Sequence, residues 1–231
     1  MEHTGEPLST PSPQLAQMVA RTLRHEVGDM LQTVYSAIAI LRARLPADAE
    51  SERRLLTELH SQAETCKFKL DAVQDLNCPL RLNCGPTNLA DVAAGLAARL
   101  GPRFPEVALQ VEGPRNLSVV ADGQRLAQIG HLLLLNAFQA AQREVRMCLG
   151  PVGDADVKWS IADDGPGANT EQLSWLTEPF RTTHFAQFGL GLAVARRVAE
   201  LHGGSVTAGN LPGGGFQVVL ILPLTPITVL K

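Results

Sequence analysis

The stretch LLLLNAFQAA (residues 132–141) places one asparagine directly after four leucines, inside a segment whose apolar pattern predicts a helix over 122–141. Burying the amide of Asn136 would be costly without a partner, because the group would lose its hydrogen bonds to water. Its carbonyl oxygen is a hard ligand, suited to a magnesium ion that keeps its waters and also contacts phosphates. The alternative is a core asparagine that bonds to backbone groups.

A second informative stretch, DDGPG (163–167), ends a strand predicted at 156–162. Gly165 and Gly167 let the backbone come close to a flat ligand, and the carboxylate of Asp163 can accept a hydrogen bond from an exocyclic amine such as that of adenine. An ordinary surface turn would have the same composition.

The third stretch, GLGLA (189–193), opens a helix predicted over 189–202. Small residues there expose amide N–H groups whose partial positive charge favours phosphate. EPFRTT (178–183) lies between the two glycine-containing stretches. Each stretch is weak evidence alone, but their order and spacing together are specific.

This ordered set resembles the N, first-glycine, F and second-glycine boxes of the ATP-binding domain of sensor histidine kinases, whose fold is shared with gyrase, Hsp90 and MutL ATPases. The resemblance continues through ADGQRL (121–126) and the final LHGGSVTAGNLPGGGFQVVLILPL, and covers residues 87–224. It implies ATP and Mg²⁺ as cofactors, with Asn136 as the metal ligand. The implied ATP-binding residues are Asn136, Asp163, Gly165, Gly167, Phe180, Gly189, Leu190 and Gly191.

The remainder of the second half mixes helices and strands without strict β-α-β alternation, which predicts an α+β fold with helices on one face of a sheet. The resemblance makes this an α/β sandwich ATP-binding domain of the Bergerat (GHKL) type over 87–231. The expected helices are 88–100, 122–141 and 189–202, and the expected strands are 107–111, 117–120, 144–149, 156–162, 204–209 and 215–222.

The first half predicts a hairpin of two long helices over 14–78. An apolar stripe runs along residues 14–45 in steps of three and four, through Val19, Leu23, Val27, Met30, Val34, Ala37 or Ile38, Leu41 and Leu45. Residues 46–50 break it, and a second stripe runs from Leu55 to Leu76. A lone hairpin leaves much of its apolar surface in water, so we expect a homodimer that forms a four-helix bundle. Residues 1–13 are expected to be a disordered tail, and residues 79–86 a linker.

The hairpin carries RHEVGD (24–29), in which a histidine and a glutamate are adjacent. His25 lies about 200° around the helix from Leu23 and from Val27, two positions of the apolar stripe, so it is expected to face solvent. A neutral imidazole can attack the terminal phosphoryl group of ATP, and Glu26 can accept its proton or hold its tautomer. The stretch resembles the phosphoacceptor box of the kinases, which implies that His25 and Glu26 are catalytic.

The sequence departs from the family pattern at several positions. Asp29 stands four residues after His25, where relatives carry Asn or Thr that often serves dephosphorylation of the partner. Leu132 stands where relatives carry Asn or Glu, which disfavours a hydrolase of the gyrase type. Gln187-Phe188 and Phe216 also depart from the pattern. These departures favour a degenerate kinase, which would act as a non-enzymatic interaction or phosphorelay module.

The bulk properties exclude some classes. The net charge of −3 and the scattered basic residues do not suggest nucleic-acid binding. No apolar run approaches the roughly 20 residues that a membrane helix needs, and the four cysteines have no metal-ligand spacing, so we expect a cytoplasmic protein with free thiols.

These observations predict a two-component histidine kinase that autophosphorylates His25 and passes the phosphoryl group to a response regulator. Its input would come from a separate sensor protein or from a region absent from this chain. The alternatives are a degenerate kinase acting as a non-enzymatic interaction or phosphorelay module, and a gyrase/Hsp90-like ATPase.

Overall fold

The computed structural model describes residues 13–46, 48–77, 80–176 and 190–224. The chain divides into two compact units, with the boundary between residues 79 and 80.

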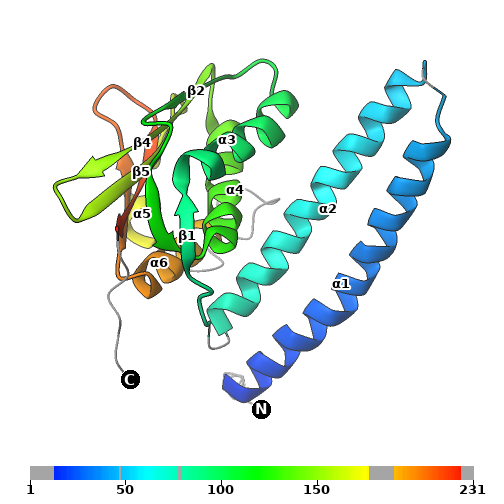
Figure 1. Cartoon of the computed structure of the whole chain (residues 1–231), viewed down its shortest axis with the longest axis horizontal. Helices are drawn as coiled ribbons and strands as arrows, with labels where there is room; N and C mark the ends of the chain where they lie inside the picture. The colour runs from blue at the N-terminus through cyan, green and yellow to red at the C-terminus, as the bar shows by residue number, and fades with distance from the viewer. Residues whose placement is uncertain (1–12, 47, 78–79, 177–189, 225–231) are drawn as a thin grey trace, which may run out of the picture. The chain divides into compact units, whose positions relative to one another are not determined.

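The first unit is an antiparallel hairpin of two long helices, α1 (Pro13–Arg44) and α2 (Glu50–Asn77), which lie side by side (Figure 1). Their interface buries small and branched apolar side chains, among them Leu31, Ile38, Leu56 and Ala72. The predicted hairpin is therefore confirmed.

The apolar stripe of α1 is only partly covered, as expected for a single hairpin. Ile38 is buried in the hairpin, but Val19, Leu23, Met30 and Leu41 are exposed. A single partner helix covers only a narrow seam of α1, so an apolar stripe this wide cannot all be buried within one hairpin. The buried positions that the stripe omitted are Ala20 and Leu31.

The second unit is built on a five-stranded sheet in the order β2-β4-β5-β7-β6, in which only β2 and β4 are parallel. A separate two-stranded sheet pairs β1 with β3. The strands are β1 (Gly85–Asn88), β2 (Ala108–Glu112), β3 (Ser118–Ala121), β4 (Glu144–Val152), β5 (Asp156–Asp163), β6 (Ser205–Asn210) and β7 (Phe216–Pro223). The helices are α3 (Leu89–Leu100), the 3-10 turn Gly101–Arg103, α4 (Gly123–Ala140), α5 (Thr170–Trp175) and α6 (Gly191–Leu201).

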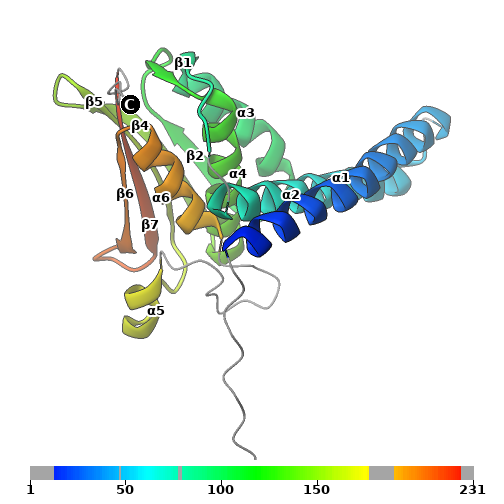
Figure 2. The ribbon, with the colours of Figure 1, turned by 90° about the horizontal axis from the view of Figure 1, so that it is seen from below.

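Helices α3, α4 and α6 pack on one face of the five-stranded sheet, and Figure 2 shows α6 beside β6 and β7. The core between helices and sheet contains Trp159 of β5, which is 1% exposed, and it lies against Gly130 of α4. The predicted α/β sandwich is confirmed.

Strand β1 and helix α5 were not expected. The expected linker 79–86 includes Gly85 and Pro86, which form the first half of β1 opposite Ala121 and Val120. Glycine and proline are typical of linkers, and here pairing with β3 makes the segment a strand. Helix α5 begins with a capping box in which Asn169 and Gln172 bond reciprocally.

Among the described residues, Cys66, Cys84 and Cys148 are free thiols. None of the described helices is both long enough and apolar enough to cross a membrane.

Candidate functional site

Helix α4 presents Asn136 on its exposed side. The four leucines before it are buried and face the core, whereas Asn136 and Gln139, one turn further on, are exposed. The amide is therefore not a core amide, and the alternative of a buried asparagine is wrong for this position. Its carbonyl oxygen is accessible to a ligand.

Asn136 lies next to the start of α6. A methyl group added at Gly191 would be 3.2 Å from Nδ2 of Asn136 and 3.6 Å from Cβ of Leu132. The structure thus brings together residues from the first and last of the predicted ATP-binding stretches, 55 positions apart in the chain. Leu132, buried beside them, supplies no acid at this place.

The first turn of α6 has backbone amides of the kind that can bind an anion. Leu190 occupies the N-cap position, and within the described part of the chain no side chain caps the helix there. The first amides of an α-helix have no intrahelical partner, and the helix dipole adds partial positive charge. Leu190 itself is buried, so its side chain packs into the domain and its backbone defines the start of the helix.

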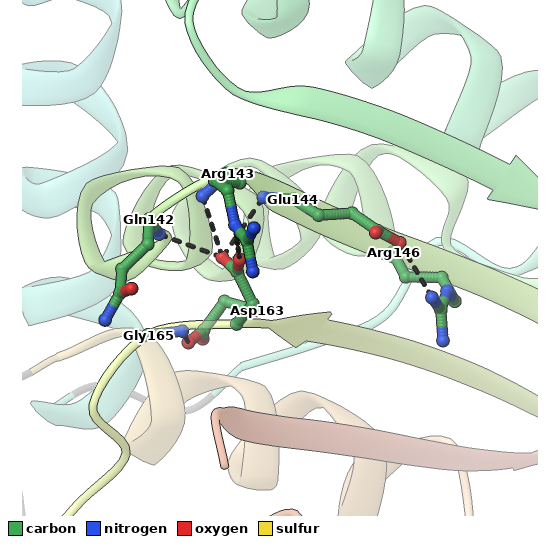
Figure 3. Close-up of polar contacts among 7 residues, drawn as sticks. Gln142, Arg143, Glu144, Arg146, Asp163 and Gly165 are labelled. Atoms are coloured by element: carbon green, nitrogen blue, oxygen red, sulfur yellow. Dashed lines mark hydrogen bonds and ion pairs between the residues drawn. The ribbon is translucent and has the colours of Figure 1, made fainter. Parts of the chain in front are cut away.

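Asp163 ends β5 as a buried carboxylate. Its Oδ1 accepts a hydrogen bond from the backbone amide of Gly165 at 2.9 Å (Figure 3). Burial raises the pKa of Asp163, while hydrogen bonds with the backbone of Gly165 and Phe216 oppose the rise. Phe216, one of the departures from the family pattern, pairs directly opposite Asp163 in the sheet.

The glycines of DDGPG are required by the packing of the protein itself. A methyl group at Gly165 would overlap the carbonyl oxygen of Ala140. Gly167 has φ +73°, and a methyl group there would be 2.6 Å from Oδ1 of Asn210. We expected these glycines to admit a ligand, but the close approach that the structure records is between segments of the same chain.

Asp164 has a role that sequence reasoning missed. Its Oδ1 accepts hydrogen bonds from the backbone amides of Gln142, Arg143 and Glu144 at 2.8, 3.0 and 3.1 Å. These bonds lower the pKa of the carboxyl group, chiefly those from Arg143 and Glu144. They tie the turn after α4 to the end of β5, which holds the helix of Asn136 beside Asp163.

Asn210 was also missed. Its side chain accepts from the amide of Ala168 and donates to the carbonyl oxygen of the same residue, both at 2.7 Å, which fixes the chain just after DDGPG. The two adjacent aspartates, and an asparagine before the late glycines, were the signals available in the sequence.

His25 and Glu26 lie on α1, and both are exposed. The residue before them, Arg24, donates through Nε to Oδ1 of Asp71 on α2 at 3.1 Å. This ion pair joins the two helices at the turn that carries His25. Phe180 and Gly189, also predicted to bind ATP, lie outside the described residues.

Comparison with known proteins agrees with this arrangement. Residues 121–226 match the family described as histidine kinase-, DNA gyrase B-, and HSP90-like ATPase. The sensor histidine kinase ZraS of Klebsiella oxytoca is 28% identical over 211 residues, which cover 89% of this chain and 46% of ZraS. The histidine-protein kinase BaeS of Escherichia coli is 26% identical over 87% of this chain and 47% of BaeS, so the chain spans about half the length of the curated relatives it matches.

Two solved structures share the fold across both units. Full-length ShkA in complex with AMPPNP has a TM-score of 0.65 at 21% identity, covering 92% of this chain and 46% of ShkA. Histidine kinase ThkA in complex with the response regulator TrrA has a TM-score of 0.60 at 20% identity, covering 92% of this chain and 62% of that one. The predicted resemblance is thereby confirmed.

Proposed function

Because the chain has the organisation of a sensor histidine kinase catalytic core, a helical hairpin followed by an ATP-binding domain, we propose that it transfers the γ-phosphoryl group of ATP to His25. The proposal rests on one observation: the exposed side chain of Asn136 lies next to the first turn of α6, which no side chain of the described residues caps.

The residues present fit a magnesium-nucleotide. The carbonyl oxygen of Asn136 is a suitable ligand for Mg²⁺, which would offset the charge of the phosphates. The first-turn amides of α6 would bind phosphate oxygens directly. The carboxylate of Asp163, buried at the end of β5, would accept a hydrogen bond from the exocyclic amine of adenine.

His25 is the proposed nucleophile. A lone pair of its neutral imidazole forms the N–P bond as the bond between the γ-phosphorus and the bridging oxygen breaks, with ADP leaving. The proton on the other ring nitrogen is then lost, and Glu26 is the neighbouring group that can accept it or hold the tautomer beforehand. The Arg24–Asp71 ion pair would restrain this turn of α1.

The proposed partners are a response regulator and a second copy of the chain. ThkA was solved with its response regulator, and by analogy we place an aspartate of such a protein as the next phosphoryl acceptor. The exposed apolar residues of the hairpin would be buried by a second hairpin in a four-helix bundle. These residues are Met18, Val19, Leu23, Met30, Ile40, Leu41, Leu55 and Leu59.

Labelled ATP tests the function. With [γ-³²P]ATP and Mg²⁺, the wild type should acquire acid-labile label, His25→Gln should acquire none, and Asn136→Ala should lose at least about tenfold in labelling because it lacks a metal ligand. His60→Gln, which changes a histidine on the other helix of the hairpin, is the matched control and should retain the label.

Label on His25→Gln would refute this acceptor. Nucleotide binding without label on the wild type would favour a degenerate module, and steady ATP hydrolysis unaffected by His25→Gln would favour the gyrase-like ATPase. Leu132, which provides no base beside Asn136, opposes that last alternative.

A further inference from the structure

Asp122 lies where three separate segments of the second unit meet. It is 6% exposed and forms the N-cap of α4, because its Oδ1 accepts from the amide of Arg125 at 3.0 Å. Its other carboxylate oxygen, Oδ2, accepts from the backbone amide of Asn83 at 2.9 Å. Asn83 lies within the segment that leads from the hairpin, before the first strand of the unit.

The backbone of Asp122 is held in turn by α6. Its amide donates to Nε2 of His202, which is 2% exposed, at 2.9 Å. Nδ1 of the same ring lies 2.8 Å from the carbonyl oxygen of Val198, and since a carbonyl can only accept, the proton is on Nδ1. The residue that binds the incoming segment is thus fixed to both helices that carry the candidate nucleotide contacts.

The bond at Asn83 fixes the chain ahead of the first strand of this unit. The expected linker reached residue 86, and within its described part Asn83 is hydrogen-bonded to Asp122 two residues before β1 begins at Gly85. Without that bond, the segment that leads to β1 would lose its fixed point at Asn83, and Gly85 would be the first residue held by strand pairing.

Tether length matters for a reaction between two units of one chain. The effective concentration of one linked group near another falls roughly as the −3/2 power of the length of a flexible link. Release of Asn83 would allow residues 83 and 84 to move with the link and would remove its fixed direction at that point, and both changes predict slower transfer.

We propose that Asp122 is a positioning residue for phosphoryl transfer, which anchors the linker at Asn83 and so sets how efficiently the bound nucleotide meets the acceptor histidine. The inference rests on the proposed function. Asp122 is not expected to contact ATP; it acts through the backbone of the linker.

Asp122→Asn isolates this role. Asparagine caps a helix as well as aspartate does, but its amide has one acceptor oxygen where the carboxylate uses two, so it cannot hold both Arg125 and Asn83. In the whole 231-residue chain, we expect kcat for autophosphorylation to fall below that of the wild type with KM for ATP unchanged. Asn83→Pro, which removes the donor N–H and keeps the carboxylate, should have the same effect.

Hydrogen exchange provides a readout that does not depend on activity. In Asp122→Asn, the amide of the exposed residue Asn83 should lose its protection, while the first turn of α4 keeps its own. The matched control is Asn88→Ala, which removes the N-cap of α3 and its bond to the amide of Leu117. This control should lower the stability of the unit and leave kcat and the exchange at Asn83 unchanged.

The outcomes separate the two proposals. If the wild type labels and both linker variants keep its kcat, or if Asn88→Ala lowers kcat equally, the positioning role is overturned and the proposed function stands. If Asn83 keeps its protection in Asp122→Asn, the anchor itself is refuted. If the wild type binds ATP and never labels, the proposed function fails, and the positioning role fails with it.

Discussion

Asp163 and Asp164 are adjacent at the end of β5, and their carboxylates occupy opposite environments. Asp163 is buried, and burial raises its pKa, whereas Asp164 accepts three backbone amides that lower its pKa. Successive side chains at the end of a strand point to opposite sides, which separates the two groups. The carboxylate of Asp163 is the one that we propose as the adenine contact, while that of Asp164 holds the turn after α4 in place.

We predict that Asp164→Ala destabilises the ATP-binding unit by about 1–2 kcal/mol, because three amides lose their acceptor in a partly exposed setting. Since the pKa of Asp164 is lower in the folded chain than its ordinary value of 3.8, the carboxylate stabilises the fold above that value, and the effect is lost as pH falls through the lowered pKa. Urea unfolding at pH 7 and pH 3 measures both effects. If Asp164→Ala is less stable than the wild type by the same free energy at pH 3 as at pH 7, the electrostatic role of Asp164 is contradicted.

The packing of α4 on β5 depends on one missing side chain. Gly130 lies against the ring of Trp159 and near Leu96 of α3, so that helix and sheet approach closely at the centre of the core. A glycine inside a helix costs about 1 kcal/mol relative to alanine, and here the close contact compensates for that cost. The position of α4, and with it Asn136, follows from this contact.

Gly130→Ala should therefore destabilise the unit by about 1–3 kcal/mol, because the new methyl group would overlap the Trp159 ring and move the helix. Gly95→Ala on α3 is the matched control: it has nothing within 4 Å, and it should raise stability by about 0.4–1 kcal/mol. Thermal unfolding monitored by circular dichroism shows whether each variant is more or less stable than the wild type. If the midpoint temperature shifts equally in the two variants, the packing argument is refuted.

At the scale of the whole molecule, the two units differ in how fully each buries its own apolar side chains. The ATP-binding unit has a core of its own between helices and sheet, but the hairpin leaves Met30 68% exposed and Leu41 50% exposed. Apolar surface on this scale in a soluble protein marks an interaction site. A second hairpin would bury it on both copies at once, because a two-fold interface uses the same patch twice.

Met30→Glu should accordingly weaken dimerisation by about 3–6 kcal/mol, since each of the two copies loses about 1.5–3 kcal/mol of apolar burial and gains a charge at the interface. Sedimentation velocity should find a monomer, and circular dichroism should find an unchanged helix content. Gln32→Glu, an exposed polar position on the same helix, is the control and should leave the mass of the wild type unchanged. A Met30→Glu protein with that same mass would exclude this surface as the dimer interface.

The resemblance to histidine kinases and most elements could be predicted from the sequence because their signals are local. Asn136 after four leucines, the glycines around 165 and 189, and the pair His25-Glu26 each lie within a few residues. Helical and strand periodicity act over the same range, so the hairpin and the main strands were predicted with small shifts at their ends.

Only the tertiary structure decided which faces are covered and which groups meet. Leu23 belongs to the apolar stripe of α1 but is exposed, because one partner helix covers a narrow seam. Asn83, Asp122 and His202 are joined across separations of 39 and 80 residues, and β1 exists through pairing with β3. Hydrogen bonds and packing act over a few ångströms of space, so such contacts are determined by how the whole chain folds and leave no pattern in the neighbouring residues.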